Sequence, residues 1–249
     1  MNKLVIIAAA VTASMTSYHV VAETAVSVVG TPVAAVYNIN HAKVAPVIDG
    51  VANKGEWTSA QALTDFTFPW RDTPAPATTF KAVWNADALY FQYAVTDANV
   101  AIGTDPERAI LDSDRVEIFL AKDANLSRYY TMEIDPKARV FSAEASYDMV
   151  NKKRASLDSN WTWKGLETKA SLTDNGYVVE GKLPLQTLTD LSLWQNKQQT
   201  QLLCALMRAE FTQQADGKLD MGWMTWVDPK TPTPNFHNPQ TFGTCRLVK

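Results

Sequence analysis

The sequence predicts an all-β protein, built as a single antiparallel β-sandwich of jelly-roll-like type with one short helix near residues 184–191. Many short runs alternate apolar and polar residues, which is the period of a strand with one buried face. The connections between these runs are rich in Asp, Asn, Gly and Pro, which favour turns. Such sandwiches commonly reach about 200–250 residues as one domain, so a chain of 249 residues requires no second domain.

Residues 1–22 have the composition of a signal peptide. Lys3 supplies a positive start, residues 4–13 form an apolar run, and residues 20–22 offer small side chains at the cleavage positions. Neither this run nor any later segment reaches the roughly 18 unbroken apolar residues that a membrane helix needs. We therefore expect export to the periplasm or the medium, with no membrane span once the signal is removed.

Residues 23–43 are expected to form a tether or an edge strand ahead of a sandwich domain at residues 44–249. Within that domain, residues 79–84 and 89–95 alternate on either side of a short turn, which predicts a hairpin. Pro184 suits the first position of the one helix-like segment. Further strands are predicted at residues 115–121, 129–134, 139–142, 176–183, 201–208, 222–227 and 243–248.

The composition excludes several classes of protein. With 23 Lys and Arg against 26 Asp and Glu, the formal net charge is -3, and no basic stripe points to a nucleic-acid partner. The 8 tryptophans are unusual in so ordinary a composition. We expect most of them, including Trp57 and Trp84, in the core, and place Trp70 and Trp226 near a ligand.

Cys204 and Cys245 are the only 2 cysteines, and both fall in predicted strands. An oxidising compartment permits a disulfide between them, worth about 4 kcal/mol through loop closure. The alternative is a pair of separate buried thiols, which pack as small hydrophobic groups. Since no CxxC spacing is present, a zinc or thiol-redox site is disfavoured.

Charged residues occur in the middle of several predicted strands. If the apolar residues of these strands face the core, the period of two places Arg115, Glu117 and Glu133 on the opposite face, and Arg208 repeats the pattern. A sheet face with carboxylates, guanidinium groups and aromatic rings suits a hydroxyl-rich ligand. The alternative is a solvated outer face with cross-strand ion pairs.

An ordered series of short motifs runs through the predicted sandwich. The series is Ile48-Asp-Gly50, Gly55-Glu-Trp57, Ala82-Val-Trp-Asn85, Asp112-Ser-Asp-Arg-Val-Glu-Ile-Phe-Leu120, Met132-Glu-Ile-Asp-Pro136, Gly176-Tyr-Val-Val-Glu180, Trp226-Val-Asp-Pro229 and Phe236-His-Asn-Pro-Gln-Thr-Phe-Gly243. In order and spacing it resembles the family-nine carbohydrate-binding modules, a DOMON-like β-sandwich, from about Val44 to the C-terminus.

The resemblance implies a sandwich that binds sugars without catalysis, sometimes with structural calcium. Glu117 falls where the family's sugar binders have a glutamate that contacts sugar hydroxyls, and Phe236 where an aromatic ring stacks on the sugar. Two positions depart from that pattern, because Leu111 replaces a second aromatic and Glu133 replaces an arginine. Three alternatives follow: the ligand differs, another aromatic such as Trp70 or Trp226 takes part, or this branch has lost sugar binding.

The remaining candidates concern a histidine and a metal. His237 follows Phe236 directly and is expected to hydrogen-bond either a ligand or a loop carbonyl. Asp105, Asp112 and Asp114 could help to hold a calcium ion, since hard cations prefer clustered oxygens, although their spacing lacks the EF-hand pattern.

The function predicted from the sequence is that of an exported, non-catalytic module that binds a mono- or oligosaccharide. Two alternatives stand beside it. One is a haem-binding electron-transfer domain, since related DOMON-like sandwiches hold haem through axial ligands such as His or Met. The other is an enzyme acting on glycosidic bonds, for which Asp112 and Glu117 could be drawn as a carboxylate pair. A separate glycoside hydrolase is the expected functional partner.

Overall fold

The computed structural model describes residues 35–52, 55–194 and 200–249. The predicted signal peptide, residues 1–22, lies outside these residues, as do residues 23–34 of the predicted tether. Within the described residues no helix is both long enough and apolar enough to span a membrane.

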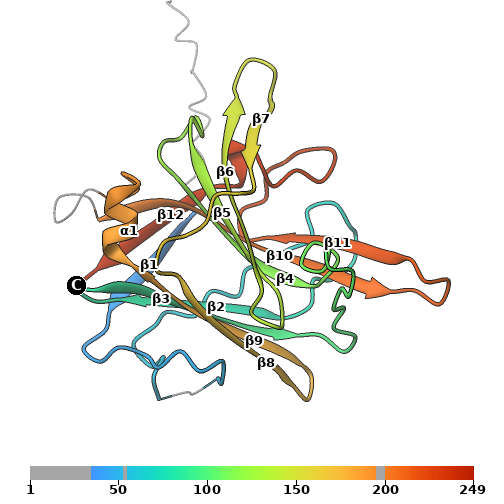
Figure 1. Ribbon diagram of the computed structural model, residues 1–249, viewed down its shortest axis with the longest axis horizontal. Coiled ribbons are helices and arrows are strands. Elements are labelled where there is room, and N and C mark those ends of the chain that lie inside the picture. The colour runs from blue at the N-terminus through green and yellow to red at the C-terminus, as the bar shows by residue number, and fades with distance from the viewer. Residues whose placement is uncertain (1–34, 53–54, 195–199) are drawn as a thin grey trace, which may run out of the picture. The chain divides into compact units, whose positions relative to one another are not determined.

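Twelve strands of the described chain form one sheet, which folds over so that its two halves face each other (Figure 1). The strands are β1 (Val36–His41), β2 (Thr78–Trp84), β3 (Ala88–Thr96), β4 (Arg115–Ala121), β5 (Tyr129–Ile134), β6 (Val140–Asp148), β7 (Lys153–Asp158), β8 (Glu167–Thr173), β9 (Gly176–Pro184), β10 (Gln201–Gln213), β11 (Leu219–Thr225) and β12 (Gly243–Val248). Their order is β7-β6-β5-β4-β10-β12-β1-β2-β3-β9-β8, and β11 pairs with β10 alone. The all-β sandwich predicted from the sequence is therefore confirmed.

The sheet is mixed rather than wholly antiparallel. β1 runs parallel to β12 on one side and parallel to β2 on the other. It therefore lies inside the sheet, whereas we had predicted a tether or an edge strand for residues 23–43. β1 therefore lies ahead of residue 44, where the sequence places the start of the sandwich domain.

The predicted helix is present as α1 (Leu185–Asp190), and Pro184 caps its start. Leu185 and Leu188 are buried and pack into the main core. One 3-10 turn, η2 (Pro239–Thr241), precedes β12, and the side chain of Asn238 accepts the backbone N–H of Gln240 at its start.

The main core lies between the two halves of the folded sheet. On β4, Val116, Ile118 and Leu120 belong to this core, whereas Phe119 and Ala121 belong to a second apolar cluster. The period of two thus holds, but every residue of β4 is buried. A solvated outer face, our alternative for the charged residues of this strand, is therefore corrected.

Glu180 on β9 joins the loop between β1 and β2 to the sheet. Its carboxylate accepts hydrogen bonds from Gly50 N at 2.9 Å, from Trp57 Nε1 at 3.0 Å and from Gln92 Nε2 at 2.9 Å. A carboxylate that is fully buried needs such donors to offset its desolvation. Two of the early sequence motifs, around Gly50 and Trp57, are therefore partners of this buried charge.

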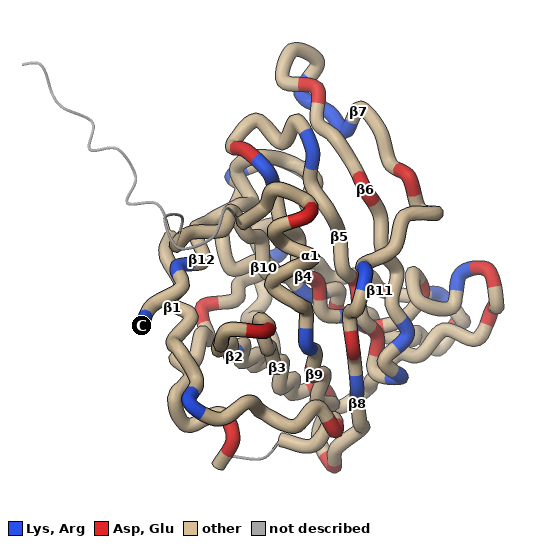
Figure 2. Tube along the Cα trace, turned by 60° about the vertical axis from the view of Figure 1, so that its left-hand side comes forward, with Lys and Arg blue, Asp and Glu red and all other residues tan. Residues whose placement is uncertain are grey.

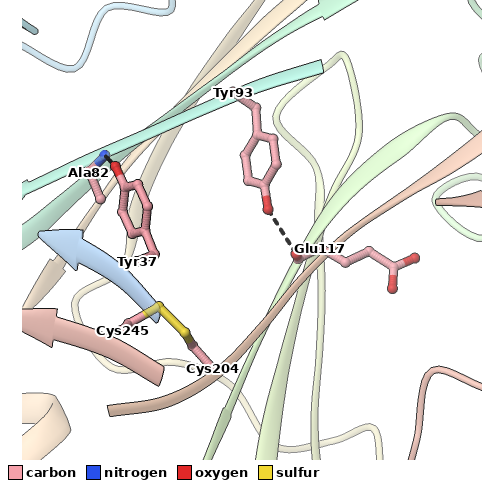
Figure 3. The surroundings of a disulfide bond; sticks show 6 residues. All are labelled: Tyr37, Ala82, Tyr93, Glu117, Cys204 and Cys245. Carbon is pink, nitrogen blue, oxygen red and sulfur yellow. Dashed lines mark hydrogen bonds between the residues drawn. A yellow bond between two sulfur atoms is a disulfide. The ribbon is translucent and has the colours of Figure 1, made fainter. Parts of the chain in front are cut away.

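Cys204 on β10 and Cys245 on β12 form a disulfide in the main core, with 5.9 Å between their Cα atoms (Figure 3). Since β10 and β12 are adjacent antiparallel strands, their register brings the two residues within bonding range. The bridge closes a chain segment of 41 residues.

Replacing both cysteines by alanine is expected to lower the free energy of unfolding by about 2–5 kcal/mol, because the unfolded chain regains the entropy of an open loop. Denaturant unfolding of the oxidised protein and of the double variant measures the difference. As a control, a reductant should shift the midpoint of the wild type and leave that of the double variant unchanged. Equal midpoints for the two oxidised proteins would contradict the expectation.

Candidate functional site

A cleft of about 750 Å³ opens on the face of β4 and β5 that points away from the main core. Its floor comes from β4 and β5, and one wall from β6 and β7. The opposite wall comes from β11 and from the loop before η2. Five strands and two loops thus converge on one concavity, whose volume lies within the roughly 300–1,000 Å³ that is usual for small-molecule sites.

Three buried charged side chains form the floor. Arg115 Nε lies 2.7 Å from Glu133 Oε2 and 3.1 Å from Glu117 Oε1. The two glutamates are direct cross-strand neighbours, which places like charges side by side. All three residues are at most 5% exposed. One guanidinium therefore serves two carboxylates in a poorly solvated place.

This crowding raises the pKa values of the two glutamates in the floor. Burial, and then the charge of Glu133, raises the pKa of Glu117 from 4.5 to about 8. Burial also raises the pKa of Glu133, although the adjacent Arg115 opposes that shift. The pair therefore holds a proton at a pH where ordinary carboxylates are ionised.

Glu117 points into the cleft with spare capacity to bind. Its Oε1 atom is buried and accepts no hydrogen bond from the described residues, although it lies beside Arg115. Its backbone oxygen, in contrast, accepts the Tyr93 hydroxyl at 3.1 Å. Figure 3 shows the side chain directed away from Tyr93 and from the disulfide of the main core. A buried acceptor that has an ion pair but no hydrogen bond can still accept a hydroxyl group.

An aromatic wall stands beside this floor. Trp223 on β11 is half-buried and lies edge-on to Phe236, with 5.4 Å between the ring centroids. The Arg115 guanidinium carbon lies 5.5 Å from the centre of the same indole. Phe236 is only 8% exposed and packs between Trp70 and Trp223, so Trp223 is the more exposed of the two aromatic residues that line the cleft beside each other.

His237 joins the wall to the floor. Burial, followed by the charges of Arg154 and Arg115, lowers the pKa of His237 to about 3, so the ring is neutral at ordinary pH. Nε2 lies 3.3 Å from Arg154 Nη1, and Nδ1 lies 2.8 Å from the Tyr129 hydroxyl. Since a guanidinium can only donate, Nε2 accepts and the ring proton is on Nδ1.

The structure gathers six of the nine predicted ligand-binding residues around the cleft: Leu111, Arg115, Glu117, Glu133, Phe236 and His237. Trp70 does not line it. Its ring lies 5.9 Å from that of Phe236, and its Nε1 donates to the backbone oxygen of Thr231. Trp70 therefore supports the aromatic wall from behind.

The placement of Trp226 beside the ligand is corrected, because its side chain packs against the main core. Met224 lies in the same core, so the period of two sends Trp223 to the cleft face. The alternation in residues 222–227 was the signal that could have identified Trp223. Lys153 and Arg154 were also missed, because β7 has no apolar alternation to reveal it.

The placement of Arg208 on the ligand face is corrected as well. Arg208 is fully buried and shares the inner face of β10 with Leu206. There its guanidinium contacts the carboxylates of Asp97 and Glu210 and donates to the Thr78 hydroxyl. This is a separate polar group within the fold, outside the cleft.

The three aspartates predicted for calcium do not cluster together. Asp112 is paired with Arg108 on the surface, and Asp105 accepts the backbone N–H of Glu107. Asp114 instead has carboxylate oxygens within 4.8 Å of those of Asp97 and Glu210. The structure therefore does not bring Asp105, Asp112 and Asp114 together, and of the three only Asp114 belongs to a carboxylate cluster of the described chain.

The carbohydrate family 9 binding domain-like model matches residues 48–249 of the chain. Exoglucanase XynX of Acetivibrio thermocellus is 31% identical over 148 residues, or 59% of this chain. Endo-1,4-beta-xylanase A of Thermoanaerobacterium saccharolyticum is 30% identical over 145 residues, or 58% of this chain. The matches cover only 12% and 11% of these relatives, so the chain spans a small part of their length.

Solved structures share the fold. A family 9 carbohydrate binding module from Caldicellulosiruptor kristjanssonii, in complex with cellotriose, has a TM-score of 0.58 at 18% identity. The comparison covers 86% of this chain and 93% of that one. The same kind of module in complex with glucose gives 0.58 at 19% identity, over 85% and 95% of the two chains. A protein from Bacteroides uniformis gives 0.63 at 16% identity, over 86% and 100%.

Replacing Glu117 by glutamine is expected to change how stability depends on pH. The wild type keeps a proton on Glu117 that the unfolded chain loses, so its free energy of unfolding falls as the pH rises from 4.5 to about 8. Glutamine does not titrate, so Glu117→Gln does not lose stability in this way. Its free energy of unfolding, relative to that of the wild type, should therefore rise between pH 4.5 and about 8, by at most about 1.4 kcal/mol per pH unit.

Denaturant unfolding at several pH values measures this difference. Glu107→Gln, at an exposed position outside the strands, is the matched control and should follow the wild type at every pH. A difference between Glu117→Gln and the wild type that stays constant from acid to mildly alkaline pH would refute the raised pKa.

Proposed function

The chain belongs to the carbohydrate family 9 binding domain-like family, and from this premise we propose that its cleft binds a mono- or oligosaccharide without catalysis. The observation that carries the proposal is that Glu117, whose buried Oε1 accepts no hydrogen bond from the described residues, lines one cleft with Arg115 and Trp223. A sugar presents hydroxyls on its edges and C–H groups on its ring face, and this cleft offers partners for both.

The floor suits hydroxyl groups. Arg115 donates and Glu117 accepts, so adjacent hydroxyls of one ring could engage both side chains at once. Charge-assisted hydrogen bonds of this kind are stronger than neutral ones. Because the floor is already buried and its side chains are held by one another, little side-chain entropy is lost on binding.

The wall suits the ring face. Trp223 takes the role that the sequence assigned to a second aromatic near Leu111, and Leu111 adds apolar contact at the same cleft. Stacking on an aromatic ring contributes about 1–3 kcal/mol for nucleic-acid bases, and we expect a sugar to gain a similar or smaller amount. The missing aromatic at Leu111 is thus offset by one from another strand.

The two alternatives receive less support from this geometry. Asp112, drawn as a catalytic partner of Glu117, is held by Arg108 on the surface and does not line the cleft. Haem would require axial ligands, and no methionine of the described chain accompanies His237 in the cleft, whose floor is charged. Export by residues 1–22 and cooperation with a separate glycoside hydrolase remain parts of the proposal.

Calcium fits the cluster of Asp97, Asp114 and Glu210. The Arg208 guanidinium contacts Asp97 and Glu210, and the Asp114 carboxylate lies within 4.8 Å of both, so three carboxylates share one cation in a largely buried place. Burial, and then the adjacent Asp97, raises the pKa of Asp114 to about 7, so the cluster favours a proton or another cation. A hard divalent ion bound there by the carboxylate oxygens would hold together the loop after β3, the loop before β4 and the strand β10.

Truncating Trp223 to alanine is expected to weaken sugar binding by about tenfold or more, because the main ring platform is lost. Calorimetric titration of the wild type and the variant with glucose and cellotriose measures the change. Met221→Ala removes an exposed apolar side chain from the same strand and should keep the wild-type affinity. Wild-type affinity in a folded Trp223→Ala protein would exclude this cleft as the binding site.

Calcium is expected to raise the melting temperature of the wild type, since a ligand that binds only the folded state stabilises it. Glu210→Gln should reduce this rise, whereas Asp112→Asn, a surface aspartate outside the cluster, should preserve it. Thermal unfolding in calcium and in a chelator measures both. An equal rise in all three proteins, or none in the wild type, would rule out the cluster as a calcium site.

A further inference from the structure

Lys153 and Arg154 bring two positive charges to the wall of the cleft. Both lie on β7, an exposed strand at the edge of the sheet, and Figure 2 shows basic positions on the β6–β7 hairpin. Arg154 is anchored over the cleft, since its Nη1 lies 3.3 Å from His237 Nε2. An arginine so placed presents its remaining donors to the cavity.

Neither of these cations forms an ion pair with any described residue. Asp148, which faces Lys153 across the hairpin, has its pKa lowered mainly by hydrogen bonds from Asn151 and only in small part by Lys153. The carboxylates that line the cleft, Glu117 and Glu133, are already shared by Arg115.

The cleft therefore has an excess of positive charge. Arg115, Lys153 and Arg154 give its lining three positive charges against the carboxylates of Glu117 and Glu133, so the cations are in excess even when both glutamates are ionised. The neutral His237 reflects the same surroundings, because the charges of Arg154 and Arg115 act with burial to lower its pKa. A neutral sugar would use none of this excess.

We propose that the cleft recognises an acidic sugar, one whose ring carries a carboxylate as a uronic acid does, and that Arg154 and Lys153 bind that carboxylate. This inference rests on the proposed function and specifies its ligand. The floor would hold the hydroxyls, Trp223 would hold the ring face, and the planar guanidinium of Arg154 matches a carboxylate with two parallel hydrogen bonds. Lys153 adds a flexible point charge at the rim.

Glucose and glucuronate are the matched probes, because they differ only in the oxidation of one exocyclic carbon. We expect the wild type to bind glucuronate at least about fivefold more tightly than glucose at low ionic strength. This preference should shrink as salt is added, since rim charges are screened. Calorimetric titration with each sugar gives the ratio of affinities.

Arg154→Gln should bring that ratio close to one. Lys152→Gln removes the same charge from the same hairpin at a position that does not line the cleft, and should keep the wild-type ratio. Glucose 6-sulfate serves as a further arm, because tight binding of the sulfate with no preference for glucuronate would overturn the assignment to a carboxylate.

The outcomes separate this inference from the proposed function. If the wild type binds glucose at least as tightly as glucuronate, the acidic-sugar inference is wrong and sugar binding stands. If Arg154→Gln keeps the full preference for glucuronate over glucose, β7 does not bind the sugar carboxylate. If the wild type binds neither sugar and no neutral oligosaccharide such as cellotriose, both proposals fail together.

Discussion

The burial of Arg115 between two glutamates on neighbouring strands is the constraint on which the candidate site depends. Two carboxylates that face each other across β4 and β5 repel, and burial increases the cost of each charge. Arg115 and a retained proton balance this cost, but Glu117 Oε1 still accepts no hydrogen bond. Under the proposed function, a ligand hydroxyl would donate to this acceptor.

Buried charges elsewhere in the described chain have more partners from the protein itself than Glu117 has, although Arg208 Nε, like Glu117 Oε1, has no hydrogen-bond partner. Glu180 is as buried as Glu117, but it accepts hydrogen bonds from Gly50, Trp57 and Gln92 and fastens the loop between β1 and β2. Arg208 is enclosed by Asp97, Glu210 and Thr78. Glu180 and Arg208 join separate parts of the fold, whereas Glu117 lines an open cleft.

The alternation of apolar residues predicted the sandwich and the two faces of β4, because a strand buried on one face must repeat every two residues. The same rule did not reveal β7, whose six residues are all exposed, so Lys153 and Arg154 carried no signal. Trp223 and Trp226 lie three positions apart in the sequence and on opposite faces, and only the core position of Met224 tells them apart. The parallel pairing of β1 depends on contacts between distant ends of the chain, which no local pattern encodes.

The central claim is that a sugar binds on the face of β4 and β5 that carries Trp223. Its most direct test is an NMR titration of the tryptophan indole N–H resonances with glucose, glucuronate and cellotriose. The account predicts a saturable shift of the Trp223 resonance, while those of Trp57 and Trp226, which belong to or pack against apolar cores, stay in place. Saturable shifts that leave the Trp223 resonance unmoved would contradict the account.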